Sequence, residues 1–201
     1  MPERPFHHGS LRTVLLDEAE KVLRERGVDA LSLRELARDA GVSHGAPRSH
    51  FIDRKALLDA LAERGFNRMA AEMRGAADRE SSDYAQSLRA CGHAYLNFAV
   101  KDSALLDLMF AAKMDDPPDS LIASAEGLFG AISDIMGAGV AAGVFPEQSI
   151  ERLTILMSAT MQGLSTFVAA RRVDTALGSA LIDDAIALFL RGASAKSESH
   201  T

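Results

Sequence analysis

The 201-residue chain has little of what marks secreted or fibrous proteins. Its single cysteine, Cys91, has no partner within the chain, and its first eight residues contain no apolar run that would serve as a signal peptide. With 47% hydrophobic and 25% charged residues, the composition excludes a disordered tail or a collagen-like fibre. We therefore expect a cytoplasmic globular protein of one domain or two small ones.

The chain also lacks an excess of basic residues, since its formal net charge is −6. A protein covered with basic residues, as a non-specific nucleic-acid binder would be, is thereby excluded. The charge is uneven: residues 1–68 contain 12 Lys and Arg against 11 Asp and Glu, and the remainder contains 10 against 17. An acidic body joined to a near-neutral segment rich in arginine and histidine is common when only that segment meets an anionic polymer.

Recognisable catalytic motifs are missing as well. We find no Ser-His-Asp set in a known context, no glycine-rich phosphate loop, no paired carboxylates placed for acid–base chemistry and no metal-ligand pattern. The apolar stretch 128–145 contains the close-packing spacing Gly139-x-x-x-Gly143, but Asp134 interrupts it and no basic cluster follows. We expect no enzyme, no cofactor, no metal and no membrane span, and we expect this stretch to be a buried helix.

Apolar residues recur at helical spacing throughout, and no segment alternates with a two-residue period. The sequence therefore predicts an all-α fold of about nine helices. The predicted helices are 10–26, one opened by the capping box Ser32-Leu33-Arg34-Glu35 and ending near Gly41, a very short one capped by Ser43, a long one capped by Asp53, and then 82–100, 103–114, 120–142, 149–170 and 175–192.

Residues 31–55 have the proportions of a helix-turn-helix. Gly41 suits the left-handed conformation that the turn needs, and Ser43 is placed to restart the chain as an N-cap. The helix after the turn offers small residues and hydrogen-bond donors, which suit a surface pressed into a DNA groove. An ordinary helical corner with a solvated polar helix is the alternative on this pattern alone.

A family pattern is carried by five segments of the N-terminal region: 19–27, Leu33-Arg34-Glu35-Leu36-Ala37, Ala40-Gly41-Val42-Ser43-His44-Gly45, His50-Phe51 and Asp53-Arg54-Lys55-Ala56-Leu57-Leu58. Over roughly residues 8–66 the chain thereby resembles the TetR family of transcriptional repressors. The His7-His8-Gly9 start is similar to one subgroup of these proteins. The resemblance implies a helix-turn-helix domain at 1–66 and a ligand-binding and dimerisation domain at 67–201.

The resemblance and the expected geometry together give DNA-facing roles. Arg54 and Lys55 lie in the first turn of a helix, an anion-favouring end, and are expected at phosphates, as are Ser32 and Arg34. The resemblance alone places His50 at a phosphate. Base edges are expected to meet His44, Gly45 and Ala46, which follow the turn. The N-cap serine, Ser43, is counted with them as a DNA-binding residue. Arg4, His7 and His8 are either a mobile arm toward the duplex or a disordered terminus.

Two residues depart from the family pattern. Arg48 stands where the family usually has an aromatic residue at a phosphate, and its guanidinium suits either that phosphate or a guanine edge. The alternative is that Arg48 is only a solvated surface residue that does not contact DNA. Pro47 costs about 3 kcal/mol deep inside a helix but little in its first turn, so the helix must begin at or after Ser43.

The second half is rich in Met, Phe and Leu and contains no tryptophan. Such soft side chains adapt to irregular ligands, although any one of them can be plain core. We predict a pocket for a small apolar ligand lined by Tyr95, Phe98, Met109, Phe110, Phe129, Met136, Met157 and Met161. The last two helices are similar to the four-helix dimer interface of the family, which implies interface residues Leu153, Leu156, Thr160, Leu164, Leu181, Ile182, Ile186 and Phe189.

These expectations combine into one functional hypothesis. The chain is expected to form a homodimer that represses transcription from a dyad-symmetric operator and leaves it when a small apolar ligand binds. The alternative is an all-α ligand-binding or scaffold protein whose helix-turn-helix does not bind DNA.

Overall fold

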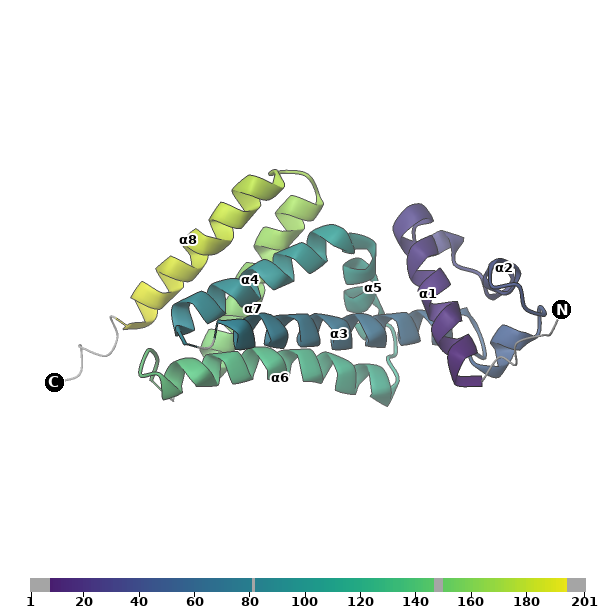
Figure 1. Ribbon diagram of the computed structural model, residues 1–201, viewed down its shortest axis with the longest axis horizontal. Helices are drawn as coiled ribbons and strands as arrows, with labels where there is room; N and C mark the ends of the chain where they lie inside the picture. The colour runs from purple at the N-terminus through teal and green to yellow at the C-terminus, as the bar shows by residue number, and fades with distance from the viewer. Residues whose placement is uncertain (1–7, 81, 147–149, 195–201) are drawn as a thin grey trace. The chain divides into compact units, whose positions relative to one another are not determined.

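The computed structural model describes residues 8–80, 82–146 and 150–194, and within these ranges the chain is helical with no strand (Figure 1). The elements are α1 (His8–Arg26), the 3₁₀ helix η1 (Val28–Ala30), α2 (Leu33–Asp39), the 3₁₀ helix η2 (Ala46–Ser49), α3 (Arg54–Arg79), α4 (Tyr84–Lys101), α5 (Ser103–Lys113), α6 (Asp119–Ala141), α7 (Ile150–Ala169) and α8 (Thr175–Ser194). The predicted all-α class is confirmed, and the number of helices is close to the nine expected.

The chain divides into two compact units. One holds the described residues through Gly65 together with Ala104–Ala123, and the other holds Phe66–Ser103 and the described residues from Ser124 onward. Segment 104–123 therefore lies in the first unit, although it follows the predicted boundary at residue 66. The division of function between 1–66 and 67–201 stays a prediction.

The core of the first unit is built from apolar stripes on three helices. Leu15 on α1, Leu36 on α2 and Leu57 on α3 are buried, with exposures of 1% or less. Phe51, at the end of the helix-turn-helix, is also buried, and the guanidinium of Arg12 lies 5.3 Å from its ring centroid. These contacts fix the helix-turn-helix against α1 and α3.

In the second unit α4, α7 and α8 pack against one another (Figure 1). Gly92 permits a close approach of α4 to α8, because an added Cβ would lie 2.8 Å from Ile182 Cγ2 and 3.0 Å from Ile186 Cδ1. The two isoleucine side chains are fully buried. This part of α8 is therefore committed to the core of its own subunit.

The apolar helix α6 is the one helix in the described part of the chain that is long and apolar enough to cross a membrane by length and composition. Its residues Leu121, Ala131 and Met136 are fully buried within the protein. Asp134 on the same helix lies 3.7 Å from the guanidinium of Arg74. The helix therefore buries one apolar face within the protein, as expected for the stretch that was predicted to be a buried helix.

Candidate nucleic-acid interface

The turn after α2 adopts the geometry that its glycine predicts. Gly41 has a φ of +68°, a left-handed conformation that favours glycine. Its N–H donates to the carbonyl of Arg38, and the N–H of Val42 donates to the carbonyl of Ala37 at 2.9 Å. The last carbonyls of α2 are thereby satisfied, and the chain reverses toward η2.

The element after the turn is a very short helix that begins after Ser43, as predicted, but its cap differs. It is a single 3₁₀ turn from Ala46 to Ser49 with Gly45 at its N-cap position, so the predicted cap at Ser43 is wrong. Pro47 gives the physical reason, because its ring would clash with the carbonyl of Ser43 four residues earlier in an α-helix and it has no N–H to donate. Ser43 instead accepts a backbone hydrogen bond from Ala46 at 3.0 Å.

The other two predicted caps, Asp53 and Ser32, are correct in position but differ in their bonds. Asp53 precedes α3, and its carboxylate accepts a hydrogen bond of 2.8 Å from the N–H of Ala56. Ser32 does occupy the N-cap position of α2, but its hydroxyl makes no capping bond, so the predicted capping box is not closed. Glu35 lies 4.0 Å from Arg38 instead.

Three basic side chains of this region are exposed and have no hydrogen-bond or ion-pair partner within the described residues: Arg34, His44 and Arg48. Arg34 is in the first turn of α2, His44 follows the turn, and Arg48 belongs to η2. Their donors are therefore available to an external anion.

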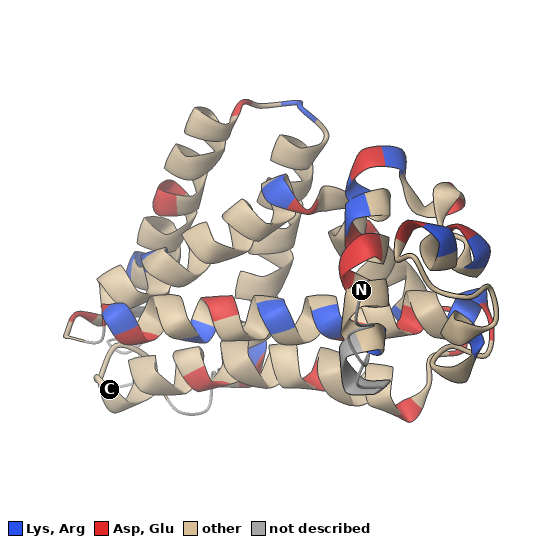
Figure 2. Cartoon of the chain, turned by 45° about the vertical axis from the view of Figure 1, so that its right-hand side comes forward, with Lys and Arg blue, Asp and Glu red and all other residues tan. Residues whose placement is uncertain are grey.

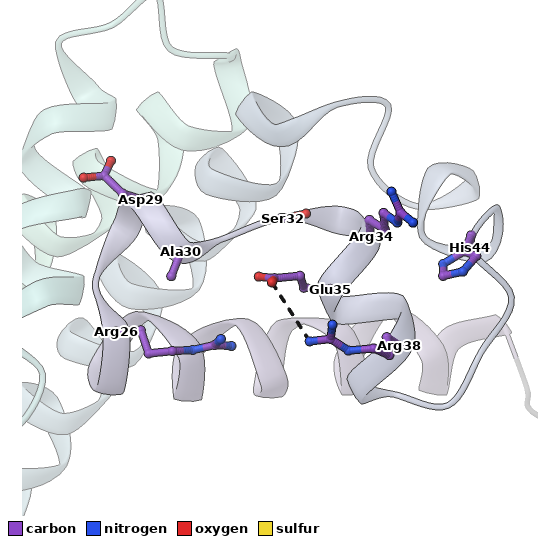
Figure 3. Close-up of a pocket in the computed structure, with 8 residues that line it drawn as sticks. All are labelled: Arg26, Asp29, Ala30, Ser32, Arg34, Glu35, Arg38 and His44. Carbon is purple, nitrogen blue, oxygen red and sulfur yellow. Dashed lines mark ion pairs between the residues drawn. The ribbon is translucent and has the colours of Figure 1, made fainter.

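A hollow of about 890 Å³ lies between the end of α1, η1 and the helix-turn-helix (Figure 3). It is lined by Arg26, Asp29, Ala30, Ser32, Arg34, Glu35, Arg38 and His44. Three predicted DNA-facing residues thus share one surface with two arginines that sequence reasoning missed, Arg26 and Arg38. Both missed arginines lie near a carboxylate of Asp39, at 3.9 Å and 3.2 Å, and are partly neutralised.

The two predicted phosphate-binding residues of α3 have internal partners. Arg54 donates to the carbonyls of Leu31 at 3.0 Å and Val28 at 2.6 Å, which ties the start of α3 to the segment before α2. The ammonium of Lys55 donates to the carboxylate of Asp59 at 3.0 Å and to the carbonyl of Asp116 at 3.1 Å. Sequence alone gave no sign of these partners, apart from the four-residue spacing of Lys55 and Asp59.

The other predicted DNA-facing residues differ in access. Gly45 is exposed, and an added Cβ would meet nothing within 4 Å, so the packing of the chain itself does not require a glycine there. Ala46 is half-buried beside it. The Nε2 atom of His50 is buried and has no hydrogen-bond partner within the described residues. Of the predicted arm, Arg4 and His7 lie outside the described residues, as does part of the His7-His8-Gly9 motif.

The predicted ligand-binding residues are mostly core. Tyr95, Phe98, Met136, Met157 and Met161 are buried in the second unit, and burial raises the pKa of Tyr95 to about 12. Phe129 of the same unit is exposed. Met109 and Phe110 belong to the first unit, where Met109 packs against Gly65.

The second unit has a hollow of about 410 Å³ between α3, α4 and α6, whose lining is different from the predicted set. Its wall includes four alanines, Ile135 and Tyr84, with Arg74 and Asp134 also lining it. The hydroxyl of Tyr84 is buried with no hydrogen-bond partner within the described residues. Small side chains on facing helices leave this space, which sequence periodicity cannot reveal.

The predicted dimer residues fall into two groups. Leu153, Ile182 and Ile186 are buried inside the subunit. The other five, Leu156, Thr160, Leu164, Leu181 and Phe189, are exposed or half-buried. The outer faces of α7 and α8 also expose apolar residues that were not predicted: Ile155, Phe167, Leu177 and Leu188.

Polar groups elsewhere in the second unit serve packing. The ring of His93 on α4 lies 3.0 Å from a carboxylate oxygen of Asp183 and 3.3 Å from the hydroxyl of Ser179, both on α8, so it links the two helices.

Burial raises the pKa of the Cys91 thiol to about 12. This cysteine therefore stays protonated, which disfavours a nucleophilic role.

Comparisons with known proteins agree with this geometry. The family described as "Bacterial regulatory proteins, tetR family" matches residues 15–61, and the family described as "Tetracyclin repressor-like, C-terminal domain" matches residues 88–190. The chain is similar to the HTH-type transcriptional repressor Rv1474c of Mycobacterium tuberculosis, with 40% identity over 65 residues. That alignment covers 32% of this chain and only about a third (35%) of the relative.

Solved structures show the same fold over nearly the whole length. A protein of unknown function from Rhodococcus sp. RHA1 is 39% identical, with a TM-score of 0.87 over 96% of this chain and 100% of that one. A putative TetR-family transcriptional regulator from Rhodococcus sp. is 19% identical, with a TM-score of 0.72 over 90% of this chain and 99% of that one.

Proposed function

Because the chain belongs to the TetR family of bacterial regulatory proteins, we propose that it is a cytoplasmic homodimeric repressor that binds a dyad-symmetric DNA operator. A small apolar ligand releases the operator. The proposal assigns DNA binding to residues 1–66, ligand binding and dimerisation to residues 67–201, and no catalytic role to any residue.

One observation carries the DNA-binding part of the proposal. Arg34, His44 and Arg48 are exposed around one helix-turn-helix and have no partner within the described residues. Around them lie Gly45, whose missing side chain leaves open space, and the hollow of Figure 3 with its further arginines. Donors held on a rigid scaffold beside a sterically open backbone suit a DNA groove.

Backbone contacts are assigned to the residues around these three side chains. Ser32 and Ser43 present hydroxyls near the helix-turn-helix turn, and Lys55 and Arg54 lie in the first turn of α3. Arg54 keeps donors beyond the two that bind Leu31 and Val28, since a guanidinium carries five N–H groups. His50 requires a rotation of its ring to bring Nε2 to a phosphate.

An uncovered apolar surface supports the homodimer. The outer faces of α7 and α8 expose Ile155, Leu156, Phe167, Leu177 and Leu188. Segment 153–170 contains no charged residue, and Figure 2 shows few charges on either helix. Apolar faces of this kind mark protein interfaces, and a second copy of the same helix pair would cover them symmetrically.

Selection of bound duplexes from a random pool tests the proposed function. We expect an enriched sequence with dyad symmetry whose half-sites lie one helical turn or a multiple apart, because a two-fold dimer presents two identical helix-turn-helix elements. A sizing run on the free protein should give a dimer. Enrichment of no sequence would instead favour the alternative, a ligand-binding or scaffold protein with an inactive helix-turn-helix.

The hollow of the second unit supports the ligand-gated part of the proposal. Its volume of about 410 Å³ lies within the usual range of about 300–1,000 Å³ for small-molecule sites. Arg74, Ala77 and Asp78 of α3 line it, and the same helix begins with Arg54 and Lys55. A ligand releases DNA only if it binds more tightly to a conformation that does not fit the operator.

Filling this hollow should mimic the ligand. Ala138→Phe is expected to lower operator affinity by roughly 5- to 150-fold, the usual range of coupling between two sites. Ala141→Phe is the matched control, because Ala141 is exposed on the same helix and is not among the residues that line the hollow. Operator binding is measured beside a thermal melt and a sizing run. Wild-type operator affinity in a folded, dimeric Ala138→Phe variant would contradict the assignment of the hollow.

A further inference from the structure

Lys55 is held on two sides by groups of its own unit. Its Nζ atom lies 3.0 Å and 3.3 Å from the two carboxylate oxygens of Asp59 and 3.1 Å from the carbonyl oxygen of Asp116. Asp59 is one turn further along α3, whereas Asp116 belongs to the loop 114–118 between α5 and α6. An ammonium has three donors, and two are therefore directed into the protein.

The ion pair between Lys55 and Asp59 is close, and the carboxylate of Asp59 is largely shielded from water. Asp59 is only 8% exposed, and a carboxylate that deeply buried needs a cationic partner. The hydrogen bond to Asp59 raises the pKa of Lys55, burial acts against this, and the charges of Asp59, Asp115 and Asp116 raise it further. Lys55 therefore stays charged, and the surrounding carboxylates balance that charge.

The loop that supplies the carbonyl is anchored at both ends, where the N–H groups of Met114 and Asp115 donate to the carbonyls of Ala111 and Ala112 and the carbonyl of Pro118 accepts from α6. Asp116 adopts a left-handed φ of +45°, and two prolines follow it before α6 begins at Asp119. The carbonyl of Pro118 accepts hydrogen bonds from Leu121 and Ile122, and the hydroxyl of Ser120 donates to the carboxylate of Glu63 on α3. The position of loop 114–118 thus determines whether the Asp116 carbonyl reaches Lys55.

We propose that Asp59 and loop 114–118 restrain Lys55, so that an operator phosphate and this internal site compete for the same ammonium. This inference rests on the proposed function, since it concerns the lysine assigned there to the DNA backbone. A phosphate at Nζ would be a second anion beside a carboxylate that is 3.0 Å from the same atom. The phosphate and the carboxylate repel each other, so binding of Lys55 to DNA weakens its pairing with Asp59.

Because of this competition, the position of loop 114–118 changes the affinity for the operator. A movement that withdraws the Asp116 carbonyl frees Lys55 and strengthens operator binding, whereas a loop held in place weakens it. Thermodynamic linkage requires the reverse effect as well, so operator binding should weaken the contact between loop 114–118 and Lys55.

Asp59→Asn tests the restraint directly. The amide cannot balance the lysine charge, so operator affinity should rise at least about fivefold, the lower end of typical coupling. The plot of log affinity against log salt should also steepen, by at most about 0.9 per subunit, because the competition leaves the Lys55–phosphate contact only partly occupied in the wild type. The matched control is Asp107→Asn, which removes an exposed carboxylate of the same unit that does not act on Lys55. The change in operator affinity in Asp107→Asn measures the general effect of removing one negative charge from this unit.

A second variant and a second measurement test the same restraint if Asp59→Asn fails to fold. Asp115→Asn combined with Asp116→Asn leaves Asp59 in place, keeps a residue type that tolerates the left-handed φ at 116, and should shift affinity and slope in the same direction by less. Deuterium uptake in segment 111–122 should rise on operator binding in the wild type and should not rise in Lys55→Met.

The outcomes separate this inference from the proposed function. If the wild type binds operator and both acid variants match Asp107→Asn in affinity and slope, the restraint is overturned and the repressor proposal stands. A loss of affinity in folded Asp59→Asn also overturns it, because Asp59 would then orient Lys55 for DNA. No binding of any selected duplex by the wild type overturns both.

Discussion

Operator affinity is expected to fall by about 10³- to 10⁵-fold when salt is raised from 50 to 200 mM, if the dimer neutralises roughly 6–10 phosphates. The reason is that each lysine or arginine bound to a phosphate releases a condensed counterion, and added salt opposes that release. Arg34, Arg48, Arg54 and Lys55, counted in both subunits, are the basic residues we assign to this interface. Titration of the selected duplex at several salt concentrations gives the slope.

Two controls make this measurement decisive. A thermal melt and a sizing run at each salt concentration separate loss of DNA contacts from loss of the fold or the dimer. A duplex of scrambled sequence gives the slope of non-specific binding for comparison. Operator binding that ignores salt would remove the phosphate contacts from the proposal, and with them the assigned roles of Arg54 and Lys55.

The fold was largely predictable because its signals are local. Helical periodicity, the carboxylate cap at Asp53 and the left-handed turn at Gly41 depend on residues near each other in the chain. The short helix at Ala46–Ser49 was predicted with its N-cap at Ser43 instead of Gly45, because the local sequence does not fix the position of the N-cap ahead of Pro47. That position depends on packing of Phe51 and Pro47 into the core.

The site was less predictable because its decisive contacts are long-range. The carbonyls bound by Arg54 come from 23 and 26 residues earlier, and the carbonyl bound by Lys55 comes from 61 residues later. The apolar stripe of α8 raises a related ambiguity. Periodicity shows that Ile182 and Ile186 are buried, but it does not say whether the cover is α4 of the same subunit or a second copy.

The base-reading role of η2 predicts the second large effect. Arg48→Ala is expected to flatten the preference at one symmetric pair of operator positions, because a bidentate arginine contact discriminates bases by about 1–3 kcal/mol. A homodimer loses the contact in both half-sites, so the total is roughly 2–6 kcal/mol, or about 30-fold to more than 10⁴-fold in affinity. His44→Ala should act at a different pair of positions. Binding is measured on duplexes that carry every substitution at each half-site position.

Two comparison variants decide what Arg48 contacts. Lys55→Ala should weaken all duplexes about equally and reduce the salt slope, as expected for a phosphate contact. Lys101→Ala removes an exposed charge on α4 and gives the effect of charge alone. If Arg48→Ala weakens every duplex equally, Arg48 binds the backbone as the aromatic residue of the family does. If it only matches Lys101→Ala, Arg48 lies outside the interface, and base recognition passes to His44 and the open backbone at Gly45.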